Sequence, residues 1–193
     1  GCLRCVVIGR HVHKLEGDVR QLFLLVLAAE NADEHHDGID QAGNGRDRQP
    51  LDPALRDAAD DTVCAVMLEL VQGEGGVVAL DADYVANVAE LCKKRDLVLI
   101  VDEVQTGVGR TGRFLACEHF DLHPDIVTLA KGLGGGLPIG AALMTAKVAE
   151  HMGPGTHGST FGGNPVVCAG ALAVLDAMDE AFMDNVLRSA AWA

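Results

Sequence analysis

Short apolar runs alternate with helical patterns along residues 62–178, and this alternation constrains the fold more than any other feature of the chain. The apolar runs span 62–70, 97–101, 126–130 and 139–144, and each has the length of a buried strand. Residues 81–95 instead repeat apolar side chains every three or four positions, as a helix packed on one face does. A second long helix is expected over 164–178, where Asn164-Pro165 is a typical helix start. The pattern predicts an α/β fold, a mainly parallel sheet with flanking helices.

Residues 1–50 carry weaker signals and are predicted to be irregular. A short helix over 19–29 is one expectation, followed by a polar loop over 31–50. His35 and His36 stand among acids there, but an exposed loop is favoured over a metal site. Cys2 and Cys5 form a CxxC without a second pair at zinc-ligand spacing, so a metal site is not expected there either. Asp52-Pro53 then has the N-cap and first-turn residues of a helix.

Composition excludes several classes of function. The chain has 193 residues, 15 Lys and Arg against 28 Asp and Glu, and a net charge of −13, which disfavours binding to nucleic-acid phosphates. No apolar run reaches the roughly 18 residues that a membrane span requires. The six cysteines mostly stand singly in apolar segments, as reduced core thiols do, so we expect a cytoplasmic protein. Length and hydrophobic content suit one globular domain.

Polar residues follow three of the predicted strands. Glu69 ends the first, Asp102 the second and Lys131 the third. Ligands of parallel sheets bind beyond the carboxyl ends of the strands, and neighbouring strands lie only about 4.8 Å apart. Lys131 precedes a glycine-rich stretch, 132–136, that lets the backbone approach a ligand, and a buried setting would favour its neutral, nucleophilic amine. We therefore expect Asp102 and Lys131 to share one small ligand.

Residues 107–112 match the pattern GxGxxG, which is also found in dinucleotide-binding proteins. That fingerprint requires the glycines in the turn between strand and helix, with a helix opening at the third glycine and an acid about 20 residues later. Five residues separate the strand from Gly107 here, and 114–120 is too short for a crossover helix. A nicotinamide-dependent oxidoreductase is therefore kept only as a minor alternative.

Four segments, 68–76, 101–112, 128–136 and 155–165, resemble the class III pyridoxal-phosphate aminotransferases, and most closely their acetylornithine branch. The carrying motifs are LELVQGEGG, VDEVQTGVGRTG, TLAKGLGGG and GTHGSTFGGNP. The resemblance covers about two-thirds of the chain, from 51 to 178. It implies that 51–193 is part of the pyridoxal-phosphate-binding large domain found in fold type I transferases. It also implies an aminotransferase that moves an amino group from N-acetylornithine, or a related ω-amino substrate, to 2-oxoglutarate in arginine biosynthesis.

The resemblance assigns roles to individual residues. It implies that Lys131 binds the cofactor aldehyde covalently and moves a proton, and that Asp102 pairs with the pyridine nitrogen. Gln105 matches a residue beside the phenolic oxygen of the ring. Ser159 and Thr160 match a loop that reaches the cofactor phosphate in a neighbouring subunit, which implies a homodimer. Glu74 matches an acid that pairs with a substrate-gating arginine. Two alternatives stay open: Glu69 and Glu74 are exposed loop acids, and Gln105 only caps the turn.

The chain also departs from the family pattern. Leu70 stands where proline is usual. Residues 1–50 show neither the family's Ser-Gly-Thr-Glu-Ala-like phosphate loop nor its ring-stacking aromatic, and Phe23 is the only aromatic residue there. The chain stops at Ala193, before the small domain that supplies a carboxylate-binding arginine. We therefore expect an incomplete large domain with a non-family N-terminal segment, and a truncated fragment that folds or dimerises without turnover is the alternative.

Overall fold

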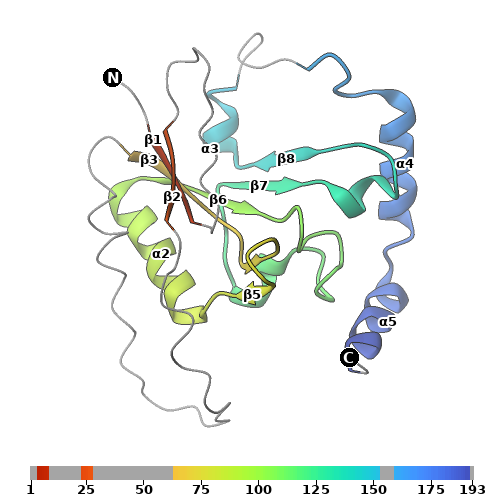
Figure 1. Ribbon diagram of the computed structural model, residues 1–193. Helices are drawn as coiled ribbons and strands as arrows, with labels where there is room; N and C mark the ends of the chain where they lie inside the picture. The colour runs from red at the N-terminus through yellow and green to blue at the C-terminus, as the bar shows by residue number, and fades with distance from the viewer. Residues whose placement is uncertain (1–3, 9–22, 28–62, 153–158, 192–193) are drawn as a thin grey trace.

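A twisted sheet forms the centre of the computed structural model, which describes residues 4–8, 23–27, 63–152 and 159–191 (Figure 1). Its strands are β1 (Arg4–Ile8), β2 (Phe23–Leu27), β3 (Val63–Leu68), β6 (Val98–Asp102), β7 (Ile126–Leu129) and β8 (Ala141–Met144). Their order is β2-β1-β3-β6-β7-β8. All neighbours pair parallel except β7 and β8, which are antiparallel. The predicted α/β fold with a mainly parallel sheet is thus confirmed.

The first two strands lie where irregular structure and a short helix were expected. Residues 4–8 pair with both β2 and β3, so they stand inside the sheet. The helix expected over 19–29 is wrong, because the run FLLVL forms β2. A five-residue run that is apolar throughout has no period by which a strand can be told from a buried helix. The prediction of irregular structure is therefore wrong for residues 4–8 and 23–27. The rest of 1–50, with Cys2, His35 and His36, lies outside the described residues. The helix expected at Asp52-Pro53 also lies outside them.

Helix α2 (Ala82–Arg95) follows the pattern read from its sequence. The Asp81 side chain caps its start by accepting hydrogen bonds from the Asp83 and Tyr84 amides at 2.8 and 3.1 Å. Three basic residues lie in its last turn, where their positive charges interact favourably with the negative end of the helix dipole. Val85, Val88 and Cys92 are buried on the face that the spacing predicted.

The core has two parts. The larger joins β3, β6 and α2 and includes Val66, Leu68, Val88 and Val101, all nearly or wholly buried. The smaller joins β7, the short 3-10 helix η2 (Lys131–Gly134) and helix α4 (Pro165–Asp176) through Val127, Leu129, Leu133 and Ala171. Alternate residues of β6 and β7 point into these cores, so the intervening residues share the opposite face.

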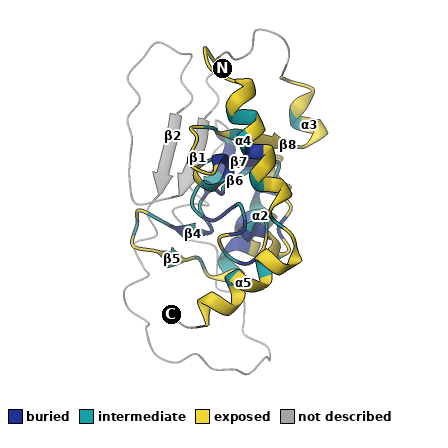
Figure 2. Ribbon diagram, turned by 90° about the vertical axis from the view of Figure 1, so that its right-hand side faces the viewer, coloured by how far each residue is buried: buried dark blue, intermediate teal, exposed yellow. Residues whose placement is uncertain are grey.

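The remaining elements lie around this frame. Strands β4 (Val71–Gln72) and β5 (Val78–Ala79) form a small antiparallel pair, η1 (Ala116–Phe120) is a 3-10 turn, and α3 (Ala146–Ala149) follows β8. Helix α4 begins at Asn164-Pro165 as predicted, and α5 (Glu180–Ala190) was not predicted. Both are largely exposed (Figure 2). No described helix combines the length and apolar character that a membrane crossing requires.

Candidate active site

The three polar residues predicted to meet at strand ends follow three strands that are neighbours in the sheet. Strands β3, β6 and β7 lie side by side and run parallel. Leu68 pairs in register with Val101, so Glu69 and Asp102 come next at the same level. Asp102 in turn is in register with Thr128, three residues before Lys131. The parallel order therefore brings Asp102 and Lys131 to the same edge of the sheet.

Two hydrogen bonds from the protein hold the Asp102 carboxylate. The Val104 amide donates to Oδ1 at 2.9 Å, and the Thr128 hydroxyl donates to the same oxygen at 3.0 Å. The other oxygen, Oδ2, accepts no hydrogen bond from the described residues. This half-buried carboxylate is thus fixed on one side and available to an external donor on the other.

Lys131 begins η2 directly beyond β7 and has an uncommon backbone conformation. Its φ is +44°, in the left-handed region, which a residue with a Cβ adopts at a cost of about 1–3 kcal/mol. Its side chain is exposed, and its ammonium makes no ion pair within the described parts of the chain. The expected buried setting is therefore wrong, because the burial of β7 ends with the strand, at Leu129.

Gln105 and Glu74 meet near this edge. The Gln105 Nε2 donates to Glu74 Oε1 at 3.4 Å, and the Gln105 side chain lies so close to Gly73 that a Cβ there would stand 2.6 Å from its Cγ. One oxygen of the Glu69 carboxylate is already bound within the protein, because Oε2 accepts a hydrogen bond from the Gly73 amide at 3.1 Å. Glu74 is exposed and Gln105 half-buried, so both have room for a further contact.

Glu103 is a buried carboxylate that the sequence analysis did not single out. It is 0% exposed and accepts hydrogen bonds from the Thr106 hydroxyl and, at 2.8 Å, from the Cys117 amide. Its own amide donates to the Thr128 carbonyl at 2.9 Å. Glu103 thus anchors the turn between Asp102 and Gln105 from the inside. One sequence signal could have pointed to Glu103, namely that an acid stands between two residues of the candidate site, Asp102 and Gln105.

Ser159 and Thr160 lie at the start of the segment that leads into α4. Both are exposed, and the Ser159 hydroxyl accepts a hydrogen bond from the Gly162 amide at 3.0 Å. Within the described residues the structure gives neither side chain a contact with Asp102 or Lys131. Residues 155–158 of the same motif lie outside the described part.

The GxGxxG segment does not have the structure of a dinucleotide site. Residues 104–115 form successive turns and bends, and the next helical element, η1, begins only at Ala116. Gly107 is required for close packing, because a Cβ there would stand 2.6 Å from Leu129 Cδ2 and 2.8 Å from the Glu103 carbonyl oxygen. Across the described ranges, no cluster of three His, Cys, Asp or Glu side chains is arranged to hold a metal ion.

Comparison with known proteins identifies the family. The model of the family "Aminotransferase class-III" matches residues 3–192. The chain belongs to the class-III aminotransferase family. This match includes the first 50 residues as well as the segment from 51 onward.

Relatives of the family are similar over long stretches. An acetylornithine aminotransferase of Haemophilus ducreyi is 58% identical over 130 residues, which cover 67% of this chain and 33% of the relative. An acetylornithine aminotransferase of Methanocaldococcus jannaschii is 45% identical over 164 residues, 84% of this chain and 41% of the relative. The chain thus spans about a third to two-fifths of the length of these curated relatives.

Solved structures of the family share the fold. N-acetylornithine aminotransferase from Stenotrophomonas maltophilia superposes with a TM-score of 0.61 at 43% identity, over 70% of this chain and 35% of that one. The ornithine aminotransferase of Toxoplasma gondii gives a TM-score of 0.69 at 34% identity, over 91% and 41%. The sheet described above is therefore that of a class-III aminotransferase.

Enzymes of the class-III family depend on pyridoxal phosphate, and the donor set at the sheet edge fits this cofactor. The ring nitrogen requires an acid, and one oxygen of the Asp102 carboxylate has no donor among the residues that the structure describes. The aldehyde requires an amine, and Lys131 has an exposed one on the neighbouring strand end. Among the described residues, Asp102 and Lys131 therefore have the chemistry that would suit these two groups of the cofactor. Ser159 and Thr160 carry exposed hydroxyls, which would suit a phosphate.

Proposed function

We propose that this chain is part of a pyridoxal-phosphate-dependent aminotransferase that uses N-acetylornithine, or a related ω-amino substrate, as donor and 2-oxoglutarate as acceptor. The proposal rests on one observation, the placement of Asp102 and Lys131 at the carboxyl ends of two adjacent parallel strands. The names of the relatives support the substrate, and a role in arginine biosynthesis would follow from it. A cytoplasmic location rests on the single cysteines in apolar segments.

The chain's residues have distinct tasks in this proposal. Bound pyridoxal phosphate would withdraw electrons from the reacting carbon of the substrate. Lys131 would hold the cofactor through its amine and would also move a proton at that carbon. The Asp102 Oδ2 atom would accept a hydrogen bond from the protonated ring nitrogen and keep that nitrogen charged. Gln105 lies beside Glu74, where it would contact the phenolic oxygen of the cofactor.

The substrate pocket and the phosphate site involve three further residues. Glu74 pairs with a substrate-gating arginine, which lets one pocket accept both a basic amino acid and a dicarboxylate. Ser159 and Thr160 bind the cofactor phosphate of a second copy of the chain, so the site is complete only in a homodimer. Their exposure, without contacts to Lys131, supports this arrangement. Residues 51–193 then form part of the cofactor-binding large domain, whose sheet also includes β1 and β2 from the first 50 residues.

Titration of the purified chain with pyridoxal phosphate tests the central step. We expect a visible absorption band that is absent in Lys131→Ala and unchanged in Lys93→Ala, a matched change of an exposed lysine on α2. Asp102→Asn should weaken cofactor binding, because a neutral amide cannot stabilise a positive ring nitrogen. A band that persists in Lys131→Ala, or no band in the parent chain, would contradict the assignment.

Glutamate formation from N-acetylornithine and 2-oxoglutarate distinguishes an active chain from a non-catalytic one. The alternative is a chain that folds or dimerises without turnover. In that case, the chain would be folded but would give little or no visible band and no glutamate. Sedimentation of the same sample measures the dimer, and dilution into monomers should release the cofactor. Cofactor retained by a proven monomer would exclude the shared phosphate site.

A further inference from the structure

Strands β6 and β7 place one polar residue each on the less buried face of the sheet, opposite one another. Val127 and Leu129 point into the core, whereas Thr128 between them is half-buried. In β6 the same alternation leaves Asp102 half-buried beside the fully buried Val101. Because Asp102 and Thr128 are register partners, their side chains are neighbours on this face.

The contact between them satisfies one oxygen of the carboxylate. The Thr128 hydroxyl donates to Asp102 Oδ1 at 3.0 Å, and the Val104 amide donates to the same atom at 2.9 Å. Two donors that share one oxygen restrict the rotation of the carboxylate more than a single donor would. The free oxygen, Oδ2, therefore has a set direction.

Thr128 also connects this carboxylate to the strand that ends in Lys131. Its carbonyl oxygen accepts the Glu103 amide at 2.9 Å, so backbone and side chain of one residue bind both members of the Asp102-Glu103 pair. A valine would have nearly the same shape and suit the apolar run 126–130 better. The hydroxyl is the feature that packing does not explain.

We infer that Thr128 is a positioning residue, which orients Asp102 so that Oδ2 faces the ring nitrogen of the cofactor. The inference rests on the proposed function, since it assigns Asp102 the ring nitrogen as partner. Thr128 does not touch the cofactor itself. Its effect is transmitted through the direction of the Asp102 carboxylate.

Three variants separate the hydroxyl from the shape of the side chain. Thr128→Val removes the hydroxyl and keeps the volume, whereas Thr128→Ser keeps the hydroxyl. The control, Thr145→Val, makes the same threonine-to-valine change at an exposed position where the side chain forms no capping hydrogen bond. Thr128→Ala serves as a second hydroxyl-free variant if Thr128→Val does not fold. Thermal unfolding of each variant measures any general loss of stability.

Two measurements then decide the matter. The carboxyl-carbon NMR signal of Asp102, assigned with Asp102→Asn, is recorded on the cofactor-free chain at pH 7. The dissociation constant for pyridoxal phosphate is measured by absorbance. We expect Thr128→Val to move the Asp102 signal and weaken cofactor binding roughly three- to tenfold, the effect of one net hydrogen bond. Thr128→Ser and Thr145→Val should leave both values close to those of the parent.

Each other outcome has a definite meaning. If Thr128→Val only lowers the unfolding temperature and leaves the Asp102 signal and the dissociation constant unchanged, Thr128 is structural and the inference is wrong. If Thr128→Ser behaves like Thr128→Val, the hydroxyl alone does not orient the carboxylate, and the inference is again wrong. If the parent chain binds no pyridoxal phosphate, the proposed function fails. The Asp102 signal still tells whether Thr128 orients the carboxylate.

Discussion

The Glu103 carboxylate lies fully buried against Cys117, whose amide donates a hydrogen bond to it at 2.8 Å. This contact joins the turn after β6 to the 3-10 helix η1, 14 residues further along the chain. The Thr106 hydroxyl donates to the other carboxylate oxygen, so both oxygens are engaged. The turn that contains Asp102 and Gln105 is therefore hydrogen-bonded to the core through the Glu103 side chain.

Removal of the Glu103 carboxylate should destabilise the chain. Glu103→Ala leaves the Cys117 amide and the Thr106 hydroxyl without an acceptor in a buried position, so we expect the free energy of unfolding to fall by about 2–4 kcal/mol. Glu103→Gln keeps one acceptor oxygen and should cost less. Urea unfolding measures both, with the exposed Glu150→Ala as a control that changes stability by less than about 0.5 kcal/mol. Equal stability of Glu103→Ala and Glu150→Ala would contradict the role of the contact.

The Cys117 thiol should react slowly with alkylating reagents. Burial raises its pKa to about 11, and the charge of Glu103 adds to this effect. Since the thiolate is the reactive form, about one molecule in a thousand is reactive at pH 8. We expect the rate of iodoacetamide labelling at Cys117, followed by mass spectrometry, to rise about tenfold per pH unit up to about pH 11. A rate that levels off near pH 9 would show that the pKa is not raised.

The same shift has a consequence for stability at alkaline pH. A thiol whose pKa is higher in the folded chain than its ordinary value of 9.0 holds its proton more tightly when folded. Its contribution is complete below about pH 9 and is lost as the pH rises toward about 11. Thermal unfolding of the parent should therefore decline over this range more steeply than that of Cys117→Ala.

Gly107 should not tolerate a larger residue. A Cβ at this position would stand 2.6 Å from Leu129 Cδ2 and 2.8 Å from the Glu103 carbonyl oxygen, and the carbonyl cannot move without disturbing the turn. We expect Gly107→Ala to lower the free energy of unfolding by about 1–3 kcal/mol. Gly140→Ala is the control, since its new Cβ would meet the nearest atom at 3.5 Å, an ordinary contact. Similar stabilities of the two variants would mean that the turn adapts.

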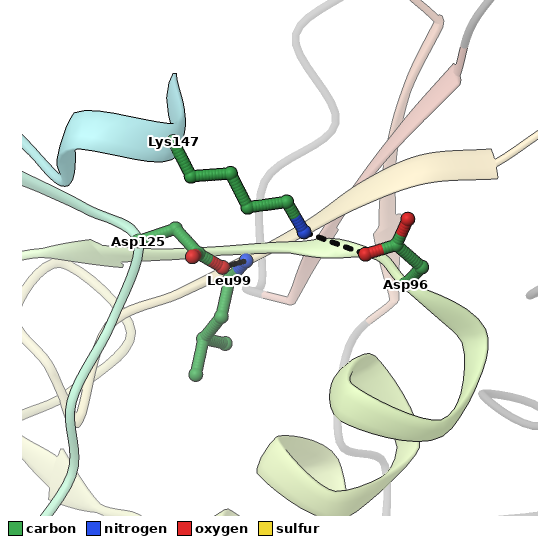
Figure 3. Close-up of polar contacts among 4 residues, drawn as sticks. All are labelled: Asp96, Leu99, Asp125 and Lys147. Carbon is green, nitrogen blue, oxygen red and sulfur yellow. Dashed lines mark hydrogen bonds and ion pairs between the residues drawn. The ribbon is translucent and has the colours of Figure 1, made fainter. Parts of the chain in front are cut away.

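An ion pair joins α3 to the end of α2 (Figure 3). Lys147 Nζ lies 2.5 Å from Asp96 Oδ1, and its side chain extends past Asp125, which itself accepts a hydrogen bond from the Leu99 amide at 2.9 Å. The hydrogen bond from Lys147 lowers the pKa of Asp96, and the same bond raises the pKa of Lys147. Both groups are exposed, so the pair should contribute little and be sensitive to salt.

Lys147→Met should therefore lower the unfolding temperature by about 2 °C or less at low salt, and by nothing measurable at 1 M salt. The contribution of Asp96 is present above its ordinary pKa of 3.8 and is lost as the pH falls through its lower folded value. That of Lys147 is present below 10.5 and is lost as the pH rises through its higher folded value. Lys93→Met, at an exposed lysine on α2, is the matched control. A salt-independent loss would indicate packing of the lysine stem instead.

Helix α2 shows what local sequence predicts well. Asp81 at its N-cap, apolar residues at a helical spacing and basic residues in its last turn all act within one element, so the prediction was confirmed. Strand β2 shows the limit, since its five apolar residues favour no period. Its neighbour β1 supplies the hydrogen bonds that decide for a strand, and that pairing is a tertiary property.

The candidate site divides in a similar way. Asp102 and Lys131 could be predicted because a polar residue directly after an apolar run marks a strand end. Thr128 and Glu103 could not, because the value of a polar residue inside or beside a strand depends on which residue stands opposite it. The register of β6 against β7 determines that Thr128 meets Asp102, and the position of η1 determines that Glu103 meets Cys117.

The amino-acid order alone determined the α/β class, the strand ends that carry Asp102 and Lys131, and the resemblance to class-III aminotransferases. Only the tertiary structure decided the order of the strands, the antiparallel direction of β8, the membership of β1 and β2 in the sheet and the exposure of Lys131. The reason is physical. Periodicity and caps act over a few neighbouring residues, whereas sheet pairing and burial depend on segments that lie tens of residues apart in the chain.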